Sequence, residues 1–422
     1  MLLLGMAQDP LHLLCIEPHF PGRLGAVADW LVRRRGYRCQ FYCHGAEAKE
    51  HWPASVGKGL ELEIFNVGGV AREQAVPWTR QLERGLCYAY GCWEVLEARR
   101  PRPVDLVLGR SAGLGSTLFA SVYLPGVPVV NLFDYFVHPR GHDLAEEAGA
   151  ETPVAYYHWR RASNAMDLLD LENGVLAWTP TCWQRDLFPV EYHDDFLVLY
   201  DGVNTHQFAK RPGSARMVAG RVIPPETRVV SFVARSLDRL RGFDRFIELA
   251  NRLLKARTDL LCIVVGDNIV QRGLDIQFYR QDYSAHVLAR SPLVDPSRAW
   301  FLGVVTQSIV AEVLAASDLH VYPSRSYVVS RSLLEAMTSG CTILAWDTGP
   351  VREFLVHGQS GLLIKADDSD AAERQALAVL ADPAAYHPFG AAATALVRER
   401  YAQDMTLPAL ASQFDRLVEK RG

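Results

Sequence analysis

Two arginines and a glycine in the second half of the sequence have the types and spacing of a phosphate site. Arg235 and Arg241 come after the apolar run Arg228–Val233, and Gly242 follows directly. Two guanidinium groups in a loop between a strand and a helix can converge on a diphosphate through charge-assisted hydrogen bonds. The alternative is that both are solvated arginines of an arginine-rich chain.

A second cluster, Ser330, Ser332 and Glu335, surrounds the start of a predicted helix. The apolar run Leu319–Tyr322 precedes it, and the helix ends at Gly340 before another apolar run. This order predicts a β-α-β unit of a parallel sheet, where ligands gather between strand end and helix start. A carboxylate there can accept hydrogen bonds from a ribose diol while the helix N-terminus faces phosphate. The alternative is that Glu335 only favours the first turn of the helix.

Both clusters resemble motifs of one enzyme family. Residues 330–341 have the sequence S-R-S-L-L-E-A-M-T-S-G-C and precede an apolar strand and a Gly-Pro loop. This resembles the nucleotide-sugar signature of the family 4 retaining glycosyltransferases, the glycosyl transferases group 1. Residues 234–244 resemble the family's G-R-x-x-x-x-K-G-F-D pattern, with Arg241 standing for Lys. The family usually has a second Glu, near the sugar hydroxyls, eight residues before the first, and here that position is Tyr327.

The resemblance implies the GT-B fold, which has two Rossmann-like doubly wound domains facing across a cleft. Residues 201–208 resemble the hinge signature N-G-V-D-x-x-x-F, and the polar segment Lys210–Thr227 is typical of a linker. We therefore predict an acceptor-side domain at 1–209 and a donor domain at 210–395. Helices at 396–422 are expected to cross back onto the first domain.

Hydrophobic patterning supports this α/β architecture independently of the resemblance. Apolar runs predict strands, and segments with helical spacing alternate with them, as in a doubly wound sheet. In the second half, the helix from Phe243 has amphipathic spacing. The predicted strands include Leu11–Ile16, Cys39–Cys43, Val104–Gly109, Val127–Leu132, Gly174–Thr179, Phe196–Tyr200 and Leu261–Val265.

The loop after the first strand contains Gly22, Arg23 and Gly25. Glycines there let the backbone approach a phosphate or a sugar closely, or they serve only a turn. The resemblance implies that this loop lies beneath the donor diphosphate and the acceptor, with Arg23 on the acceptor side. An incomplete G-x-G-x-x-G weakens the interpretation as a dinucleotide dehydrogenase.

Aromatic and polar residues follow the predicted strand Val127–Leu132. Asp134, Tyr156 and Trp159 are candidates for the acceptor, because aromatic faces beside polar groups suit sugar rings. The alternative is a core cluster beneath a loop. The resemblance implies a His near the transferred sugar, for which we choose His138, although His142 competes.

The resemblance implies the remaining donor contacts residue by residue. The backbone of Phe301–Val305 resembles F-L-G-x-V, which usually meets the nucleotide base, so the base stays undetermined. We leave the insert at 271–298 unassigned. The donor-binding candidates are Gly22, Gly25, Arg235, Arg241, Gly242, Gly266, Gly303, Val304, Tyr327, Ser330, Ser332, Leu333 and Glu335.

Length and composition exclude several other classes of protein. The 422 residues suit two or three domains, and a net charge of -4 argues against general nucleic-acid binding. No apolar run reaches a membrane span, and the opening MLLLGM lacks the basic region of a signal peptide. Eight scattered cysteines predict reduced thiols, a cytoplasmic protein and no zinc site. Arginine patches such as Arg33–Arg35 are solvated or face anionic lipid at the inner face of the membrane.

The sequence thus predicts a retaining enzyme that transfers a hexose-type sugar from a nucleoside diphosphate sugar to a hydroxyl of a glycan, lipid-linked saccharide or small molecule. Arg235, Arg241 and His138 are the catalytic candidates. Because the arginines neutralise the leaving group and no Asp-x-Asp clamp is present, we expect no metal and no other cofactor. The alternatives are a hydrolytic or epimerising protein of the same fold, a non-catalytic sugar-binding member, and an NAD-dependent enzyme.

Overall fold

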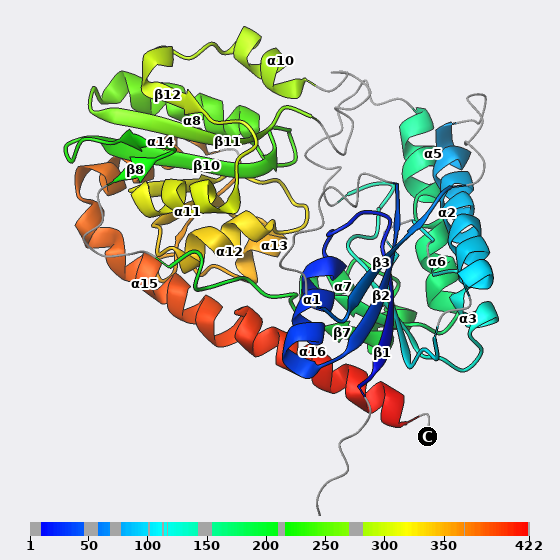
Figure 1. Ribbon diagram of the computed structural model, residues 1–422. Coiled ribbons are helices and arrows are strands. Elements are labelled where there is room, and N and C mark those ends of the chain that lie inside the picture. The colour runs from blue at the N-terminus through cyan, green and yellow to red at the C-terminus, as the bar shows by residue number, and fades with distance from the viewer. Residues whose placement is uncertain are drawn as a thin grey trace, which may run out of the picture. The chain divides into compact units, whose positions relative to one another are not determined.

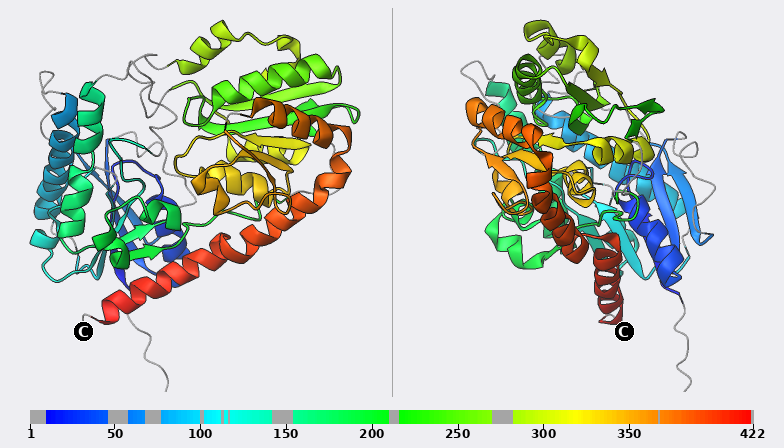
Figure 2. Two further views of the ribbon diagram at one scale, coloured as in Figure 1. Left: turned by 180° about the vertical axis from the view of Figure 1, so that it is seen from behind. Right: turned by 90° about the vertical axis from the view of Figure 1, so that its left-hand side faces the viewer.

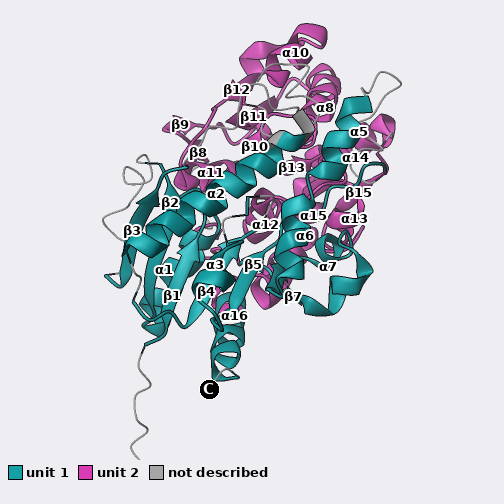
Figure 3. Cartoon of the chain, turned by 90° about the vertical axis from the view of Figure 1, so that its right-hand side faces the viewer, with its two compact units in different colours: residues 1–140, 151–201, 406–422 teal, residues 141–150, 202–405 magenta. Residues whose placement is uncertain are grey.

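The chain forms two compact units, each built on its own parallel sheet (Figures 1 and 3). One unit contains Met1–Arg140, Glu151–Asp201 and Thr406–Gly422, and the other contains Gly141–Ala150 and Gly202–Met405. The computed structural model describes residues 10–45, 58–67, 77–99, 102–111, 114–115, 117–141, 154–209, 216–269, 282–366 and 368–420.

In its described part, the first unit has a seven-stranded sheet with the order β3-β2-β1-β4-β5-β6-β7. The strand order reverses between β1 and β4. The strands around this point are buried on both faces, which explains their continuous apolar sequences. The strands are β1 (His12–Ile16), β2 (Arg38–His44), β3 (Leu60–Phe65), β4 (Leu106–Arg110), β5 (Val129–Leu132), β6 (Leu176–Thr179) and β7 (Phe196–Val198).

Helices pack on both faces of this sheet. Figures 1 and 2 show α2 side by side with α5, and α1 lies against the other face. Helix α1 ends at Gly36, whose φ of 69° closes the helix in the left-handed conformation that glycine favours. The helices are α1 (Leu24–Arg35), α2 (Pro77–Arg99), α3 (Ala120–Tyr123), α5 (Val154–Ala162), α6 (Ala165–Glu172), α7 (Cys182–Arg185) and the 3-10 turn η2 (Val190–Asp195).

Within the described residues of the second unit, the main sheet has the order β12-β11-β10-β13-β14-β15. The strand order reverses between β10 and β13, and β8 pairs with β9 in a separate small hairpin. The strands are β8 (Met217–Val218), β9 (Arg221–Val222), β10 (Arg228–Ser236), β11 (Leu260–Asp267), β12 (Ala299–Phe301), β13 (Leu319–Tyr322), β14 (Ile343–Trp346) and β15 (Leu362–Ile364).

The helices of the second unit cover its sheet from two sides. Helix α8 buries the predicted apolar stripe of Phe243, Phe246, Ile247 and Ala250 and packs beside α14. Figure 1 shows α11 and α12 on the opposite face from α8. The helices are α8 (Phe243–Ala256), α10 (Tyr283–Arg290), η3 (Pro296–Arg298), α11 (Gln307–Ala316), α12 (Arg331–Thr338), α13 (Gly349–Arg352), α14 (Ser369–Ala381), α15 (Pro383–Arg400) and α16 (Gln403–Glu419).

The last two helices divide between the units. Helix α15 stays in the second unit, because Thr394 donates to the carbonyl of Met337 at 2.8 Å and Gly390 packs directly on the backbone of Gly340. Helix α16 buries Leu407, Leu410, Ala411 and Phe414 in the core of the first unit. The second unit therefore extends to Met405, whereas the sequence placed the return to the first domain at residue 396.

Several other predicted features differ from the structure. The N-terminal part of the first unit ends at Asp201 rather than at residue 209. Residues 210–215 of the predicted linker lie outside the described residues, and the rest of it contains the β8-β9 hairpin. Strand β3 was not predicted, although its sequence, LELEIF, alternates glutamates with apolar residues as a half-buried strand at the edge of a sheet does. The unassigned insert contains α10 and η3, and its residues 271–281 lie outside the described part.

Among the described helices, none combines the length and the apolar character needed to cross a membrane.

The packing of α16 leads to a stability prediction. Phe414→Ala should lower the free energy of unfolding of the first unit by about 3–5 kcal/mol, because it removes a fully buried ring and leaves a cavity. Met405→Ala, at a side chain of the same helix that is 55% exposed, is the control and should change it by less than about 0.5 kcal/mol. Urea unfolding measures both variants. Equal midpoints for the two would contradict the packing described here.

Candidate functional site

The predicted donor residues of the second unit lie along the carboxyl edge of its sheet. Strands β10 and β13 are parallel neighbours. From β10 the chain continues to β11 on one side of this pair, and from β13 it continues to β14 on the other side. In open parallel sheets, ligands bind at this point of reversal, outside the carboxyl ends of the strands. The loop after β10 carries Arg241 and Gly242, and the loop after β13 carries Tyr327 and Ser330.

The turn after β10 is built around a buried carboxylate. Asp238 is 3% exposed and accepts hydrogen bonds from the Ser236 hydroxyl and, at 2.9 Å, from the backbone N–H of Arg241. Burial raises the pKa of Asp238, against the opposing effect of Arg241. Arg235, near the end of β10, has an exposed side chain. The turn has one residue more between its two cations than the family pattern.

Gly242 is required by a close approach of two backbones. Its φ is 76°, and an added Cβ would lie 2.1 Å from the carbonyl oxygen of Pro323. Any other residue would push the start of α8 away from the loop after β13. Gly242 therefore positions Arg241 against this loop.

The guanidinium of Arg241 lies over the loop before α12. Its Nη1 donates to the carbonyl of Val328 at 2.9 Å, and its Cζ lies 5.4 Å from the ring centre of Tyr327. Within the part of the chain that the structure describes, this is the single hydrogen bond of the guanidinium. Since arginine has five N–H donors, most of them are available to an anionic ligand.

Glu335 is a buried carboxyl group on α12. It is 5% exposed, and burial raises its pKa to about 7 despite the opposing charge of Arg331. No hydrogen bond or ion pair of its carboxylate is found among the described residues. A buried carboxylate without donors is destabilised until a ligand supplies them.

The N-terminus of α12 is held by hydroxyl groups. Ser330 is its N-cap, and the Ser330 N–H donates to the hydroxyl of Tyr322 at 2.9 Å. The hydroxyls of Ser330 and Ser332 are 2.6 Å apart, and Leu333 is fully buried. The helix thus presents hydroxyls rather than carboxylates at its positive end, which favours an anionic ligand.

The remaining donor candidates lie at the ends of β11 and β12. The Gly266 N–H donates to the carbonyl of Gly303 at 3.1 Å, and an added Cβ on Gly266 would lie 2.9 Å from the carbonyl of Ala234. Val304 follows with a side chain that is 77% exposed. Both glycines therefore shape the edge of the sheet next to β10.

In the first unit, the loop after β1 has its own buried anion. Glu17 is fully buried, and its carboxylate accepts from the Leu24 N–H at 2.9 Å and the Arg23 N–H at 3.3 Å. It fills the position at the start of α1 that we predicted for a donor phosphate. Gly22 is needed because an added Cβ would lie 2.2 Å from Glu17, and Gly25 packs on Pro21. Donor binding by these two glycines stays a prediction.

An alternating chain of charges continues from Glu17. Arg110 donates to Glu17 at 2.9 Å and to Asp134, and Arg23 donates to Asp134 at 2.7 Å. Arg23 also pairs with Asp201 through two hydrogen bonds. The predicted acceptor residues Arg23 and Asp134 are thus bonded to each other. Sequence reasoning missed Glu17 and Arg110, although both stand at ends of strands where site residues gather.

The other candidates of the first unit have structural partners. The His138 Nε2 lies 2.8 Å from the carbonyl of Leu187 and donates to it, so this nitrogen is tethered. Tyr156 is buried on α5 and stacks on Trp159, with ring centres 5.4 Å apart. His142 lies outside the described residues. The catalytic role of His138 stays a prediction.

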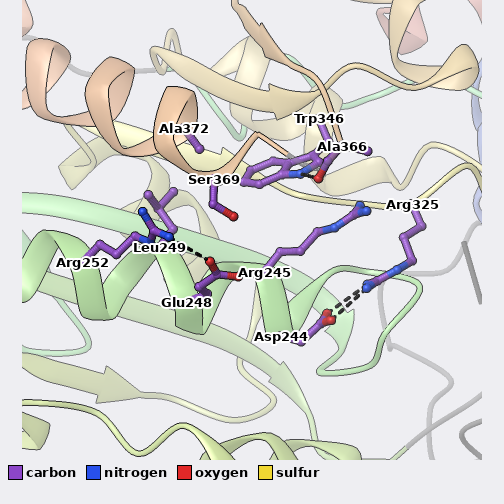
Figure 4. A pocket seen from close by; sticks show the side chains of 10 residues that line it. All are labelled: Asp244, Arg245, Glu248, Leu249, Arg252, Arg325, Trp346, Ala366, Ser369 and Ala372. Carbon is purple, nitrogen blue, oxygen red and sulfur yellow. Dashed lines mark hydrogen bonds and ion pairs between the residues drawn. The ribbon is translucent and has the colours of Figure 1, made fainter.

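A separate pocket of about 600 Å³ lies between α8 and α14 (Figure 4). Arg325 pairs there with Asp244 at 2.8 Å, and Arg252 pairs with Asp370 at 2.7 Å. Carboxylates of the same chain neutralise these two arginines, and no predicted site residue lines the pocket. We therefore do not assign the donor to it. Among the described residues, no cluster of His, Cys, Asp and Glu is arranged to hold a metal ion.

Known structures share this fold along nearly the whole chain. Sucrose-phosphate synthase from Thermosynechococcus elongatus matches with a TM-score of 0.74 and 14% identity, over 97% of this chain and 100% of that one. Anabaena Alr3699/HepE in complex with UDP and glucose matches with a TM-score of 0.67 and 17% identity, over 96% of this chain and 100% of that one. These matches confirm the predicted GT-B class of fold.

Curated relatives match parts of the sequence. The lipopolysaccharide core biosynthesis mannosyltransferase LpcC of Rhizobium leguminosarum bv. viciae is 27% identical over 178 residues, 42% of this chain and 48% of that protein. The alpha-maltose-1-phosphate synthase of Mycolicibacterium smegmatis is 26% identical over 321 residues, 73% of this chain and 76% of that protein. The matched part spans 48% and 61% of the mannosyltransferases LpcC and LpsB.

Sequence models of one family cover both units. The model described as Glycosyl transferase family 4 group matches residues 35–208, and the model described as Glycosyl transferases group 1 matches residues 217–396. The second match includes Arg235, Arg241 and Glu335. Together with the shared fold, these matches show that the chain belongs to the family 4, group 1 glycosyltransferases.

Proposed function

We propose that this protein is a retaining glycosyltransferase that moves a hexose-type sugar from a nucleoside diphosphate sugar to a hydroxyl group. The observation that carries the proposal is the joint placement of Arg241, the N-terminus of α12 and the buried Glu335 at the reversal of strand order between β10 and β13. Family membership and the matched HepE structure, a complex with UDP and glucose, support the same class of reaction.

The proposed chemistry rests on stabilising the leaving group. As the bond between the anomeric carbon and the phosphate oxygen breaks, negative charge grows on the diphosphate and the sugar becomes oxocarbenium-like. We expect Arg235, Arg241 and the positive end of α12 to neutralise that charge. The acceptor oxygen bonds to the same face of the anomeric carbon, and its proton passes to the departing phosphate oxygen. We therefore assign no protein general base.

Glu335 has the properties of a ribose ligand in this scheme. Its carboxylate lacks hydrogen-bond donors among the described residues, and a ribose diol supplies two. On the acceptor side, our candidates remain Arg23, Asp134, Tyr156 and Trp159, and His138 remains the candidate nearest the transferred sugar. We also propose a cytoplasmic protein, since the eight cysteines, most of them buried, form no disulfide within the described residues.

A transfer assay tests the proposed function. Thermal shifts with a panel of nucleotide sugars should identify a donor, because binding stabilises only the folded state. That donor should then yield a product with retained anomeric configuration, and the rate should be the same in excess EDTA, since arginines neutralise the leaving group. Loss of activity on chelation, restored by magnesium or manganese, would overturn metal independence. Sugar release without an acceptor would favour a hydrolase, and binding without turnover would favour a non-catalytic protein.

Arg241 should contribute most of the binding free energy between the protein and the diphosphate. Arg241→Ala should weaken donor binding by about 1.5–3 kcal/mol, the value of a charge-assisted hydrogen bond, and lower turnover. Arg241→Lys should be milder, because it keeps the charge. Arg252→Ala, in the pocket of Figure 4, is the matched control and should bind the donor as wild type does. Titration calorimetry measures all three, and loss of binding in the control instead would move the donor to that pocket.

Glu335 should make donor binding depend on pH. Burial raises the pKa of its carboxyl to about 7. Only the ionised form accepts both ribose hydrogen bonds, so the donor should bind about tenfold more weakly at pH 6 than at pH 8. Glu335→Gln should bind more weakly at pH 8 and lose this dependence, whereas Glu353→Gln, a control at the end of α13, should keep it. A Glu335→Gln variant with the wild-type pH profile would rule out the ribose assignment.

A further inference from the structure

Two departures of this chain from the family pattern lie in contact. Arg241 stands where the family commonly has Lys, and Tyr327 stands where it usually has Glu. They are far apart in the sequence, yet the Arg241 Cζ lies 5.4 Å from the ring centre of Tyr327. Tyr327 is only 8% exposed, so its ring is fixed by packing. The side chain at position 327 therefore affects the side chain at position 241, and the reverse also holds.

The ring and the guanidinium suit each other chemically. A planar guanidinium stacks on an aromatic face, whereas the compact ammonium of Lys does so less well. The backbone fixes both partners, since the Tyr327 N–H donates to the carbonyl of Arg325 at 2.7 Å and Arg241 donates to Val328 at 2.9 Å. The ring thus limits the directions in which Arg241 can point.

A carboxylate at position 327 would act differently on Arg241. It would form an ion pair with the guanidinium, occupy its N–H donors and reduce its net charge. An aromatic ring attracts the cation through its face and leaves the N–H groups for a ligand. Tyr at this position keeps Arg241 both oriented and available.

We propose that Tyr327 is a positioning residue for Arg241. Arg in place of the family's Lys and Tyr in place of its Glu then form one coupled adaptation for binding the donor diphosphate. The proposal rests on the proposed function. It assigns to Tyr327 an effect on the phosphates, in contrast to the contact with sugar hydroxyls that the family pattern implies.

Binding of nucleoside diphosphates without a sugar separates these two roles. Tyr327→Leu should weaken binding of the preferred one of UDP, GDP and ADP by about 3- to 30-fold, the range expected for a cation–π contact. Tyr327→Phe keeps the ring and should recover most of that loss. Tyr88→Leu is the matched control, because Arg84 also lies 5.4 Å from a buried tyrosine ring there. It should bind as wild type does.

A double-mutant cycle completes the test. Arg241→Lys should cost several-fold in affinity while Tyr327 is present, but little in the Tyr327→Leu background. Additive effects, or a Tyr327→Leu variant that binds nucleoside diphosphates normally and loses only nucleotide-sugar binding, would overturn the positioning role. If Tyr327→Leu does not fold, Tyr327→Glu replaces it in the cycle and should weaken nucleoside diphosphate binding. A wild type that binds none of the three nucleotides would instead overturn the proposed function itself.

Discussion

The close approach of the α8 N-terminus to the loop after β13 is the constraint on which the donor side depends. Gly242 adopts a left-handed conformation and leaves no room for a Cβ beside the carbonyl of Pro323. This contact places Arg241 against Val328, 87 positions away in the sequence. It exists because β10 and β13 are neighbours at the reversal of strand order. Arg241 and the helix that carries Glu335 are thereby held by one packing contact.

Buried charged groups are compensated in different ways in the two units. At the edge of the first sheet, Glu17, Arg110, Asp134, Arg23 and Asp201 satisfy one another, so the loops there are cross-linked by ion pairs. Breaking such a buried pair is costly, because it leaves an uncompensated charge. At the edge of the second sheet, a guanidinium keeps N–H donors available and a carboxyl group is buried without donors among the described residues. A ligand bound there would offset the desolvation cost of these two groups, whereas in the first unit the buried charges already compensate one another.

The sequence predicted the strands and helices that carry the candidate donor residues, because apolar periodicity follows directly from burial on one or both faces. Arg241, Gly242, Ser330 and Glu335 were predicted as site residues in the same way, since they stand at strand ends and helix starts in motifs that resemble a known family. The edge strand β3 was missed, although its alternation of glutamates and apolar residues is the pattern of a half-buried strand. The return point of the C-terminal helices was misplaced, because it depends on the packing of Gly390 against Gly340.

Contacts between side chains distant in the sequence were decided by the tertiary structure alone. Arg23, which was predicted to face an acceptor, donates to Asp201, 178 positions away, and His138 is tethered to the carbonyl of Leu187. Tyr327 was predicted to be a donor-binding residue, and its ring lies against the guanidinium of Arg241. The sequence by itself determined the fold class, the family and which residues reach the sheet edge. Which of them meet there depends on the order of strands and on close backbone packing, and neither property is encoded in local periodicity.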